Sequence, residues 1–340
     1  MRVTILDDWF DTLRTLPSFG LLDGHDVTIH NDHEERVDAL AERLAGTEAL
    51  VLIRERTPIP AELIERLPNL RLISQRSAHP HIDIDSCTRH GVLVCSNLHT
   101  DTPSYATAEL TWALVLASVR QVPQQMASLR AGTWQMGIGK TLRGRTIGLY
   151  GYGRIAKAVA HYAAAFAMNV WWWASADGRA RATADGAAVA PSRTAFFAES
   201  QIVSVHIRLT PATRSAITRA DLAAMRPDAL FVNTSRAGVV EPGALPAALD
   251  AGRPGYAAVD VYDTEPLPQS DDPFIHHPNL VATPHIGYVT EDEWDLQFTD
   301  IYDQVNAYQA GHPINMINPE AIDWTDQRPP PERGVGSRHE

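Results

Sequence analysis

The stretch from 145 to 174 constrains the fold more than any other part of this chain. Its apolar start, 146–150, has the length and composition of a buried strand, and 170–173 has those of a second strand. Between them, residues 154–167 are good helix formers with apolar side chains at helical spacing. A strand, a glycine turn, a helix and a second strand in about 30 residues form one βαβ unit. The sequence therefore predicts a parallel α/β sheet built around this stretch.

The turn of this unit carries the pattern Gly-x-Gly-x-x-Ala at Gly151, Gly153 and Ala156. The first glycine allows a sharp exit from the strand, the second lets a pyrophosphate approach the backbone, and the small third residue lets the helix lie against the strand. The helix N-terminus then offers unpaired N–H groups and a positive dipole end to phosphate oxygens. The pattern alone also fits an ordinary glycine turn. Strand, helix and second strand in register around it favour a dinucleotide-binding site.

The residue that usually selects the dinucleotide is missing. An acidic side chain normally ends the second strand and binds the adenosine ribose, but positions 173–175 hold Trp, Ala and Ser. Asp177 lies slightly beyond, followed by Arg179 and Arg181. Together with Ser175 and Arg208, these arginines could receive a 2′-phosphate, so we expect NADPH to be accepted. The alternative is that the arginines are solvated and NADH binds through backbone and serine contacts.

Composition narrows the class of protein. A chain of 340 residues is long enough for two domains, and its net charge of −12 argues against nucleic acid or an anionic membrane as the main partner. No apolar run is long enough to span a bilayer, and the first residues lead into a strand without a signal peptide. Cys87 and Cys95 lack C-x-x-C spacing, so we expect a reducing, cytoplasmic setting and no metal site.

Short apolar strands alternate with helical segments on both sides of the central unit. The predicted strands are 3–6, 26–30, 49–53, 70–74, 92–95, 202–206, 229–232, 257–261 and 280–282. The predicted helices are 38–44, 60–67, 103–120, 123–131 and 290–310, with a polar connection after Trp173. This alternation indicates two doubly wound parallel sheets with helices on both faces. Residues 327–340 are rich in Pro, Gly and Arg, which predicts a disordered tail.

Polar side chains follow the later strands, at the end where parallel sheets place their ligands. They include Arg236, Glu265 and His285. Arginine can bind a carboxylate through two parallel hydrogen bonds, histidine can exchange a proton near neutral pH, and a neighbouring glutamate favours the imidazolium. Each residue alone has an ordinary explanation as a surface, turn or capping residue. Their joint placement favours a redox reaction on a 2-oxo acid.

Five ordered segments resemble the D-isomer-specific 2-hydroxyacid dehydrogenase family, which includes phosphoglycerate, D-lactate, hydroxypyruvate and glyoxylate enzymes. The segments are 151–156 (GYGRIA), 206–213 (HIRLTPAT), 233–241 (NTSRAGVVE), 260–266 (DVYDTEP) and 283–287 (TPHIG). The resemblance implies two Rossmann-like domains and a homodimer through the cofactor domains. The implied division is a cofactor domain at 102–287, a flavodoxin-like substrate domain at 1–101 plus 288–320, and a tail at 321–340.

The resemblance also assigns roles to single residues. Arg236 would bind the substrate carboxylate and carbonyl, His285 would be the acid/base, and Glu265 would be its partner. Asp260 would hold the nicotinamide carboxamide. The other residues expected at the NAD or NADP are Thr107, Gly151, Tyr152, Gly153, Arg154, Ile155, Ser175, His206, Thr213, Thr234, Ser235 and Gly287, together with Arg236 and His285.

The sequence departs from the family at residues 75–81 (QRSAHPH), where relatives have a glycine-rich loop that usually holds the substrate carboxylate. Arg76, Ser77 and Ala78 are therefore the expected substrate contacts of the first domain. Arg76, His79 and His81 are three potential cations, which suit a substrate with a second anionic group. The alternative is that a proline rigidifies the loop and its histidines face solvent.

Two other functions are compatible with part of the pattern. Some relatives of this fold are corepressors that sense nucleotides without catalysis, but the complete set of Arg236, Glu265 and His285 argues against this function. An L-specific dehydrogenase would usually carry its nucleotide motif near the N-terminus, not after a complete first lobe. Glu265 also argues against a formate dehydrogenase, because those relatives lack the glutamate.

Overall fold

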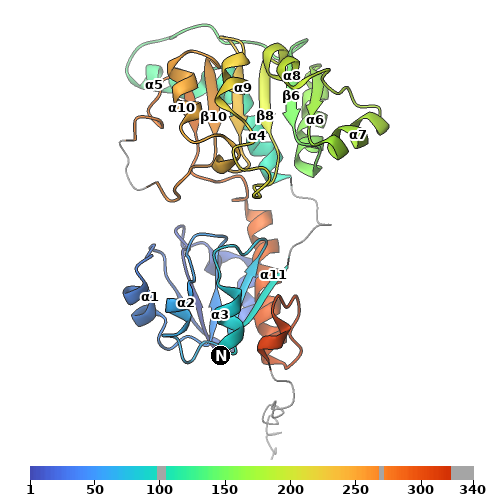
Figure 1. The fold of residues 1–340 in the computed structure, drawn as a ribbon. Coiled ribbons are helices and arrows are strands. Elements are labelled where there is room, and N and C mark those ends of the chain that lie inside the picture. The colour runs from blue at the N-terminus through green and yellow to red at the C-terminus, as the bar shows by residue number, and fades with distance from the viewer. Residues whose placement is uncertain (98–104, 268–271, 323–340) are drawn as a thin grey trace, which may run out of the picture. The chain divides into compact units, whose positions relative to one another are not determined.

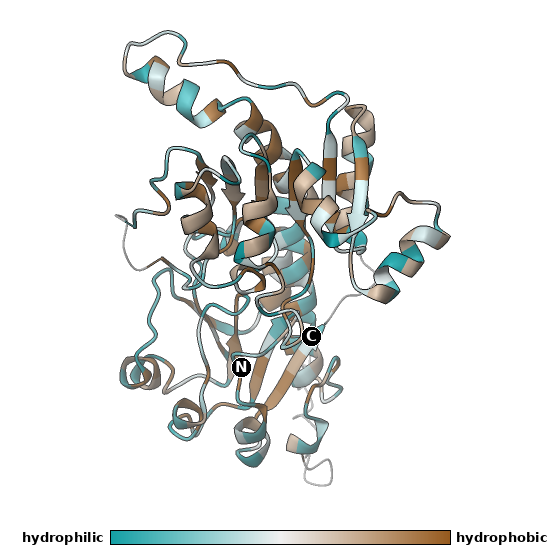
Figure 2. Cartoon of the chain, turned by 45° about the horizontal axis from the view of Figure 1, so that its top comes forward, coloured by the Kyte–Doolittle hydropathy of each residue, from teal (hydrophilic) through white to brown (hydrophobic). Residues whose placement is uncertain are grey.

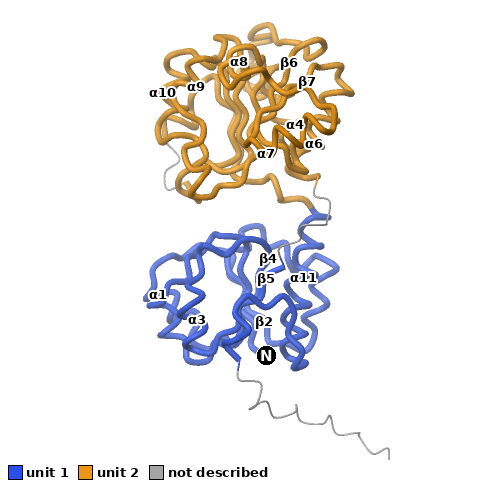
Figure 3. The backbone as a smooth tube through the Cα atoms, turned by 45° about the vertical axis from the view of Figure 1, so that its right-hand side comes forward, with its two compact units in different colours: residues 1–102, 291–340 blue, residues 103–290 orange. Residues whose placement is uncertain are grey.

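The computed structural model describes residues 1–97, 105–267 and 272–322. The chain divides into two compact units, residues 1–102 with 291–340 (unit 1) and residues 103–290 (unit 2), shown in Figures 1 and 3. Unit 2 is therefore inserted into the sequence of unit 1. The sequence had placed these boundaries after residues 101 and 287. Most of the predicted tail, from residue 323 onward, lies outside the described residues.

Unit 1 contains a five-stranded parallel sheet in the order β2-β1-β3-β4-β5. The strands are β1 (Arg2–Ile5), β2 (Asp26–Ile29), β3 (Ala49–Val51), β4 (Leu72–Arg76) and β5 (Leu93–Asn97). The direction of strand progression reverses between β1 and β3. This is the flavodoxin-like strand order, in which ligands bind at the carboxyl ends of the strands beside the reversal.

Helices cover both faces of this sheet. One face packs against α1 (Val37–Arg43), α2 (Ala61–Ile64) and α3 (Ile84–Arg89). The other is covered by the long α11 (Glu291–Gln309) and the 3₁₀ helix η2 (Pro17–Leu22), while η1 (Leu13–Thr15) and η4 (Pro319–Ala321) lie in connections.

Buried hydrogen bonds fix α11 to β4. Ser74 Oγ donates to the carbonyl of Ile301 at 2.8 Å, and Gln304 Nε2 donates to Ser74 Oγ at 2.9 Å. The Gln304 amide also donates to the backbone carbonyl of Gln75 at 3.0 Å. The last long helix thus completes unit 1, although more than 180 residues of unit 2 precede it in the sequence.

Unit 2 contains a six-stranded parallel sheet in the order β11-β10-β9-β8-β6-β7. The strands are β6 (Thr146–Tyr150), β7 (Asn169–Trp173), β8 (Ile202–Val205), β9 (Leu230–Asn233), β10 (Tyr256–Val259) and β11 (Leu280–Ala282). Here the progression reverses between β6 and β8. The predicted fold class is confirmed, because both sheets are parallel and doubly wound.

Alternate residues of these strands enter two separate cores. Val203, Val205 and Phe231 pack on one face, with α8 (Arg193–Glu199), α9 (Arg219–Ala224) and α10 (Ala244–Asp250). Residues of the opposite parity, such as Ile202 and Leu230, pack on the other face with α4 (Ala106–Val119) and α6 (Arg154–Ala165). When both faces of a sheet are buried, nearly every residue of each strand is apolar. This is why the sequence showed these strands as short continuous apolar runs.

The structure differs from the sequence expectations mainly after β7. The segment predicted as a polar connection contains the helix α7 (Ala176–Ala184). Ser175 is its N-cap, with Oγ accepting a hydrogen bond from Gly178 N at 3.2 Å. Only Gly178 and Ala182 are buried in α7, so its sequence has no apolar periodicity. The short helix α3 was also missed, and several predicted ends differ by a few residues, as is usual where helices and strands fray.

Two further helical segments belong to unit 2. Helix α5 (Val122–Arg130) follows α4 and has no buried residue, and η3 (Ala237–Val239) follows β9. The predicted start of the helix at 103–120 lies outside the described residues, and the helix is described from Ala106 onward.

Candidate active site

Two glycines shape the turn between β6 and α6. Gly151 has a φ of +121°, which side chains rarely adopt, and a Cβ there would collide with the carbonyl group of His206. Gly153 is the N-cap of α6, and no described atom lies within 4 Å of the point where its Cβ would stand. The N-terminus of α6 therefore faces open space at the reversal of the sheet. A dinucleotide pyrophosphate fits both features.

We expect Gly151→Ala to prevent normal dinucleotide binding and to destabilise unit 2. The alanine would meet backbone atoms that cannot move independently, and a strained backbone position costs roughly 1–3 kcal/mol. Gly153→Ala is the matched control, since its methyl group would meet no protein atom. The Gly153→Ala variant should keep the wild-type melting temperature. It should still weaken NADH binding, because its methyl group would stand in the space expected for the pyrophosphate. The two quantities can be measured by thermal unfolding and by NADH fluorescence titration. Wild-type values for Gly151→Ala would contradict the assignment.

The end of β7 presents an arginine and no carboxylate. Ala174 is buried, and Arg179 Nη1 donates to its carbonyl at 2.5 Å. The Arg179 guanidinium carbon lies 4.4 Å from the ring centre of Trp173. Among the described residues, Arg179 Nη2 has no hydrogen-bond partner. A guanidinium is thus held at the strand end where the adenosine ribose is expected, beside the Ser175 cap.

The side chains of the glycine turn and of the first turn of α6 differ in burial. Tyr152 is buried, its hydroxyl donates to Asp185 Oδ2 at 2.6 Å, and its ring meets that of Trp172 edge to face at 4.7 Å. Ile155 is partly buried against the same core, and Arg154 is exposed. Tyr152 therefore anchors the turn, and its backbone, not its hydroxyl, is available to a cofactor.

The loop after β8 is closed by its own side chains. Thr213 Oγ1 donates to the carbonyl of Arg208 at 2.6 Å and accepts from Thr210 N at 2.8 Å. His206 Nε2 lies 2.9 Å from Ser204 Oγ, and burial lowers the pKa of His206 to about 3. His206 is therefore uncharged at neutral pH. These contacts give His206 and Thr213 a role in shaping the loop beside Gly151.

Asn233 organises the turn after β9. Its Oδ1 accepts hydrogen bonds from the backbone N–H and the hydroxyl of Ser235, both at 3.0 Å, and its Nδ2 donates to the carbonyl of Arg236 at 3.0 Å. Thr234 Oγ1 lies 2.7 Å from the hydroxyl of Thr111 on α4. The half-buried Arg236 donates from Nη1 to the Ser235 carbonyl at 2.7 Å. The turn fixes the backbone that carries the predicted substrate arginine.

Asp260, at the end of β10, gathers the loop that carries His285. Its Oδ1 accepts from Thr283 Oγ1 at 2.6 Å and from Ile286 N at 2.8 Å, and its Oδ2 accepts from Gly287 N at 2.8 Å. Burial raises the pKa of Asp260, and these three hydrogen bonds oppose that shift. Both carboxylate oxygens are thus engaged within the loop. The sequence had assigned Asp260 to the nicotinamide, and this organising role was missed.

Gly287 completes the same arrangement. A Cβ at Gly287 would stand 3.0 Å from Asp260 Oδ2, and the Gly287 carbonyl accepts a hydrogen bond from Thr107 Oγ1 at 2.8 Å. Thr107 lies in the first turn of α4. It therefore ties the helix that begins unit 2 to the loop after β11, where the resemblance had placed both residues beside the cofactor.

His285 and Glu265 form a hydrogen-bonded pair between His285 Nδ1 and Glu265 Oε2. The other glutamate oxygen, Oε1, accepts from Tyr262 N at 2.8 Å, which orients the carboxylate. The imidazole packs edge to face against Tyr288 at 5.5 Å, and the side chain is 20% exposed. Since Nδ1 is engaged, Nε2 is the nitrogen available to a substrate. The sequence had placed Glu265 beside His285, and the structure shows this contact, while the acid/base role of His285 stays a prediction.

The loop after β4 in unit 1 is held by a buried glutamine. Gln75 Nε2 donates to the carbonyls of Ser77 and Ala78 at 3.3 and 3.0 Å, and Ser96 Oγ donates to the Ser77 carbonyl at 2.7 Å. Ser77 has a φ of +87°, which is unusual for a residue with a side chain. The backbone of the predicted substrate contacts Ser77 and Ala78 is therefore fixed by neighbouring side chains.

The structure corrects the expectation of three cations in this loop. Arg76 Nε lies 3.1 Å from Asp300 Oδ2 on α11, and both side chains are largely buried, at 10% and 17% exposure. Burial lowers the pKa of His81 to about 4, so its imidazole is neutral at neutral pH. The charge of Arg76 is thus balanced by the Asp300 carboxylate, which lies more than 200 residues away in sequence. No local sequence pattern could indicate this ion pair.

The sequence analysis missed a pair of arginines at the same edge of the unit 1 sheet as Arg76. Arg54 and Arg56 follow β3, and Arg54 has a φ of +60°. Arg56 Nη1 donates to the Asp7 carbonyl at 2.7 Å, and its guanidinium carbon lies 3.9 Å from the ring centre of Trp9. Both arginines stand where the strand order reverses. An Arg-x-Arg directly after a predicted strand was the available signal.

Cys87 and Cys95 are free and fully buried, and burial raises the pKa of each thiol to about 12. At pH 8 only about one thiol in 10,000 is then ionised, and the thiolate is the reactive form. We expect the folded protein to resist an aromatic disulfide reagent, while the urea-unfolded chain releases two equivalents of thiol per chain. Fast labelling of the native protein at pH 8 would contradict this expectation.

Within the described ranges, no group of three or more His, Cys, Asp and Glu side chains is arranged to hold a metal ion. A search of the same residues finds no helix with the length and apolar character needed to cross a membrane.

Comparison with known proteins identifies the family. Residues 112–287, more than half of the chain, match the model of the D-isomer specific 2-hydroxyacid dehydrogenase, NAD binding domain. The chain belongs to the D-isomer-specific 2-hydroxyacid dehydrogenase family. The family predicted from five short segments is thus confirmed, and unit 2 contains its NAD-binding domain.

Individual relatives show how far the similarity extends. The chain is 31% identical to a D-3-phosphoglycerate dehydrogenase of Methanocaldococcus jannaschii over 83% of its own length and 54% of that protein. It is 31% identical to a glyoxylate reductase of Thermococcus litoralis, covering 83% of this chain and 87% of that protein. The crystal structure of a phosphoglycerate oxidoreductase from Vibrio cholerae matches with 42% identity and a TM-score of 0.87 over 92% and 99% of the two chains. The chain spans about half the length of the curated phosphoglycerate dehydrogenases it matches.

Proposed function

We propose that this family member transfers a hydride between NADH or NADPH and a 2-oxo acid, with the D-2-hydroxy acid as the reduced product. The observation that carries the proposal is the His285–Glu265 hydrogen bond, which leaves Nε2 for proton exchange. Arg236 stands at the same carboxyl edge of the sheet, because β9, β10 and β11 are parallel neighbours. A proton donor and a carboxylate-binding cation on one edge suit reduction of a carbonyl beside a carboxylate.

Each residue then has a defined task. A bound NAD(P)H supplies the hydride to the carbonyl carbon. Arg236 holds the carboxylate and polarises the carbonyl, and His285 Nε2 gives its proton to the carbonyl oxygen. Glu265 stabilises the imidazolium before that transfer and fixes the ring afterwards. The reverse reaction uses neutral His285 to take the hydroxyl proton. Asp260 and Thr107 keep the His285 loop in place through the contacts described above.

A screen of 2-oxo acids tests the proposal directly. Purified full-length protein is mixed with NADH or NADPH, and oxidation is followed at 340 nm with pyruvate, glyoxylate, hydroxypyruvate and 2-oxo acids that carry a second anionic group. Turnover should appear with at least one acid and produce the D-isomer. Failure of every acid with both cofactors, although NADH binding is retained, would favour the nucleotide-sensing alternative.

We expect NADPH to be accepted, because Arg179 stands at the end of β7 and no carboxylate occupies the ribose position. Arg179→Ala should lower kcat/KM for NADPH about 10- to 150-fold, the value of one charge-assisted hydrogen bond, and should change NADH kinetics little. Arg143→Ala is the matched control, because Arg143 is an exposed arginine that precedes β6, at the opposite edge of the unit 2 sheet. A wild-type preference for NADH beyond about 100-fold, near 2.7 kcal/mol, would refute this expectation.

The substrate proposal also includes residues of unit 1. We assign Arg76, Ser77 and Ala78 to substrate contact through the fixed loop backbone, while Arg54 and Arg56 are the better candidates for reading a second anionic group. Arg54 and Arg56 follow β3, at the reversal of the strand order where this kind of sheet places its ligands. Arg56→Ala should therefore affect an anionic 2-oxo acid more than glyoxylate. If Arg56→Ala lowers activity on both acids by the same factor, Arg56 supports the loop structure and does not bind the second anionic group.

We also propose a homodimer through unit 2 and a reducing, cytoplasmic setting suited to the two free thiols. Val122, Met126 and Leu129 are exposed along one face of α5, and Trp134 and Ile138 in the following segment are 76% and 96% exposed. Figure 2 shows α5 and this segment on the outside of unit 2, apart from its sheet. An apolar surface of this extent marks an interface. Light scattering would test the dimer, and Leu129→Asp with Trp134→Ser should yield monomers.

A further inference from the structure

Tyr262, which follows β10, is hydrogen-bonded to both loops that carry the His285–Glu265 pair. Its backbone N–H donates to Glu265 Oε1 at 2.8 Å, and its hydroxyl donates to the Thr283 carbonyl at 2.9 Å. Thr283 stands two residues before His285 in the sequence. A single residue therefore contacts the glutamate carboxylate through its backbone and the histidine loop through its side chain.

The backbone of His285 adopts a conformation that needs support from its surroundings. Its φ is +54°, in the left-handed region that residues with a side chain rarely adopt. Such a conformation persists only where neighbouring contacts determine it. The Thr283 carbonyl accepts a hydrogen bond from the N–H of His285 at 3.0 Å and a second one from the Tyr262 hydroxyl. The Tyr262 hydroxyl thus fixes the carbonyl group that holds the histidine backbone.

Asp260 supports the same loop but cannot replace Tyr262. Its carboxylate accepts hydrogen bonds from the Thr283 hydroxyl and from the two backbone N–H groups that follow His285. A carboxylate accepts hydrogen bonds and cannot donate one to a carbonyl oxygen. The Thr283 carbonyl therefore needs a donor from elsewhere, and Tyr262 supplies it.

The Tyr262 side chain is suited to hold this contact. Its ring is half-buried against the core that contains Phe231. Burial, together with the nearby Asp260 and Glu265 carboxylates, raises the pKa of Tyr262 to about 12. The hydroxyl therefore keeps its proton, and remains a donor, over the whole pH range in which a histidine changes its charge.

We propose that Tyr262 is the positioning residue of the His285–Glu265 pair. Its N–H fixes the glutamate carboxylate and its hydroxyl fixes the histidine backbone, so the two side chains stay in contact while Nε2 gives its proton to the substrate. Tyr262 exchanges no proton itself and acts through His285. This inference rests on the proposed acid/base reaction and adds the residue that holds its proton donor in place.

Tyr262→Phe tests the proposal in the full-length protein, because it removes the hydroxyl and keeps the ring and the N–H. The Thr283 carbonyl keeps its bond to the His285 N–H, so the fold should be retained. We expect kcat for reduction of a 2-oxo acid to fall about 2- to 12-fold, the value of one hydrogen bond. KM for the acid should stay near the wild-type value, since Arg236 still binds the carboxylate.

The pH profile separates a positioning role from a role in folding. When the Glu265 carboxylate is held less well against the ring, the imidazolium is favoured less. The profile for reduction by Tyr262→Phe should therefore move toward lower pH, in the same direction as that of Glu265→Gln. A lower melting temperature with an unchanged profile and unchanged kcat would mean that Tyr262 only supports the fold, and would overturn the proposal.

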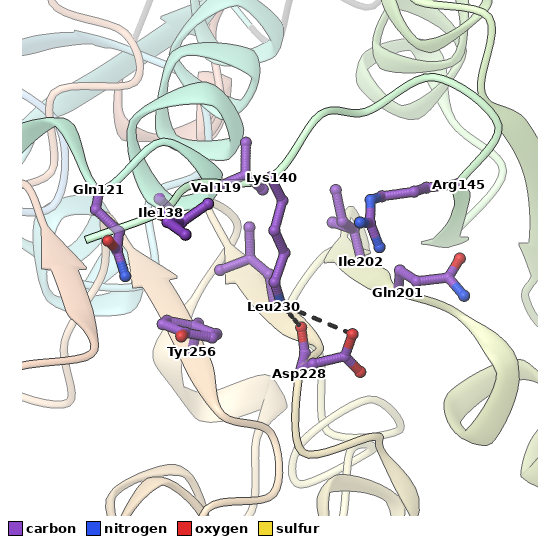
Figure 4. A pocket seen from close by; sticks show the side chains of 11 residues that line it. Val119, Gln121, Ile138, Lys140, Arg145, Gln201, Ile202, Asp228, Leu230 and Tyr256 are labelled. Atoms are coloured by element: carbon purple, nitrogen blue, oxygen red, sulfur yellow. Dashed lines mark hydrogen bonds and ion pairs between the residues drawn. The ribbon is translucent and has the colours of Figure 1, made fainter.

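Tyr256→Phe is the matched control, because it makes the same substitution in the first residue of β10, at the opposite edge of the sheet. Figure 4 shows Tyr256 at that edge, in a pocket that Gln121 and Leu230 also line. The control variant should keep the wild-type kcat, KM and pH profile. An equal loss of kcat in Tyr256→Phe and Tyr262→Phe would contradict the positioning role.

NMR of protein labelled with ¹⁵N-histidine gives a second measurement that needs no substrate. The wild-type protein should show a downfield Nδ1–H signal that is absent from His285→Ala. Tyr262→Phe should shift this signal upfield and broaden it, whereas Tyr256→Phe should not. Failure of every 2-oxo acid would refute the proposed reaction, and this comparison would still decide the role of Tyr262. An identical signal in Tyr262→Phe, or no such signal in the wild-type protein, would overturn the proposal.

Discussion

His285→Ala should lower kcat for reduction of a 2-oxo acid by about 100- to 10,000-fold, the usual contribution of a positioned proton donor. Nδ1 of His285 is engaged in the hydrogen bond with the Glu265 carboxylate, so the substitution removes Nε2, the nitrogen that can serve the substrate. Steady-state kinetics with the best 2-oxo acid measures the loss. NADH binding should be largely unchanged, because the turn at Gly151 and Gly153 is untouched.

His161→Ala is the control, since His161 is an exposed residue of α6. It should retain wild-type kcat. Turnover of the His285→Ala variant near the wild-type rate would end the acid/base assignment. Glu265→Gln keeps a hydrogen-bond partner but removes the charge that favours the imidazolium. Reduction needs the protonated ring, so its pH profile should move toward lower pH in that variant.

Arg236→Ala should lower kcat/KM for a 2-oxo acid by about 100- to 10,000-fold, because two charge-assisted hydrogen bonds of roughly 1.5–3 kcal/mol each are lost. The Asn233 contacts that hold this turn involve the Arg236 backbone, so the turn should survive the substitution. Arg236→Lys keeps the charge without the planar fork and should recover only part of the loss.

A neutral substrate separates carboxylate binding from a general defect. The 2-oxo amide corresponding to the preferred acid lacks the carboxylate charge, so wild-type activity on it should be low and Arg236→Ala should change it little. If acid and amide lose the same factor, Arg236 acts on the cofactor or on the turn, and another residue binds the carboxylate.

Local patterns were sufficient for the fold and for the proposed catalytic residues. The glycine turn was visible because Gly151 and Gly153 stand between an apolar run and a helical one, and the structure gives Gly151 a backbone angle that favours glycine. The ends of β9, β10 and β11 could be placed together without coordinates, since parallel strands share one carboxyl edge. Glu265 and His285 were paired on this basis, and the structure joins them directly.

Contacts between residues far apart in the sequence decided the rest. Asp300 forms an ion pair with Arg76, and burial keeps the His81 imidazole neutral. Both carboxylate oxygens of Asp260 accept hydrogen bonds from the loop that carries His285. A side chain's charge and hydrogen-bond partners depend on its burial and on which distant groups pack beside it. Residue type and spacing therefore determined the strands, the turns and the edge where chemistry is placed, while only tertiary packing decided which of the charged side chains are left for a ligand.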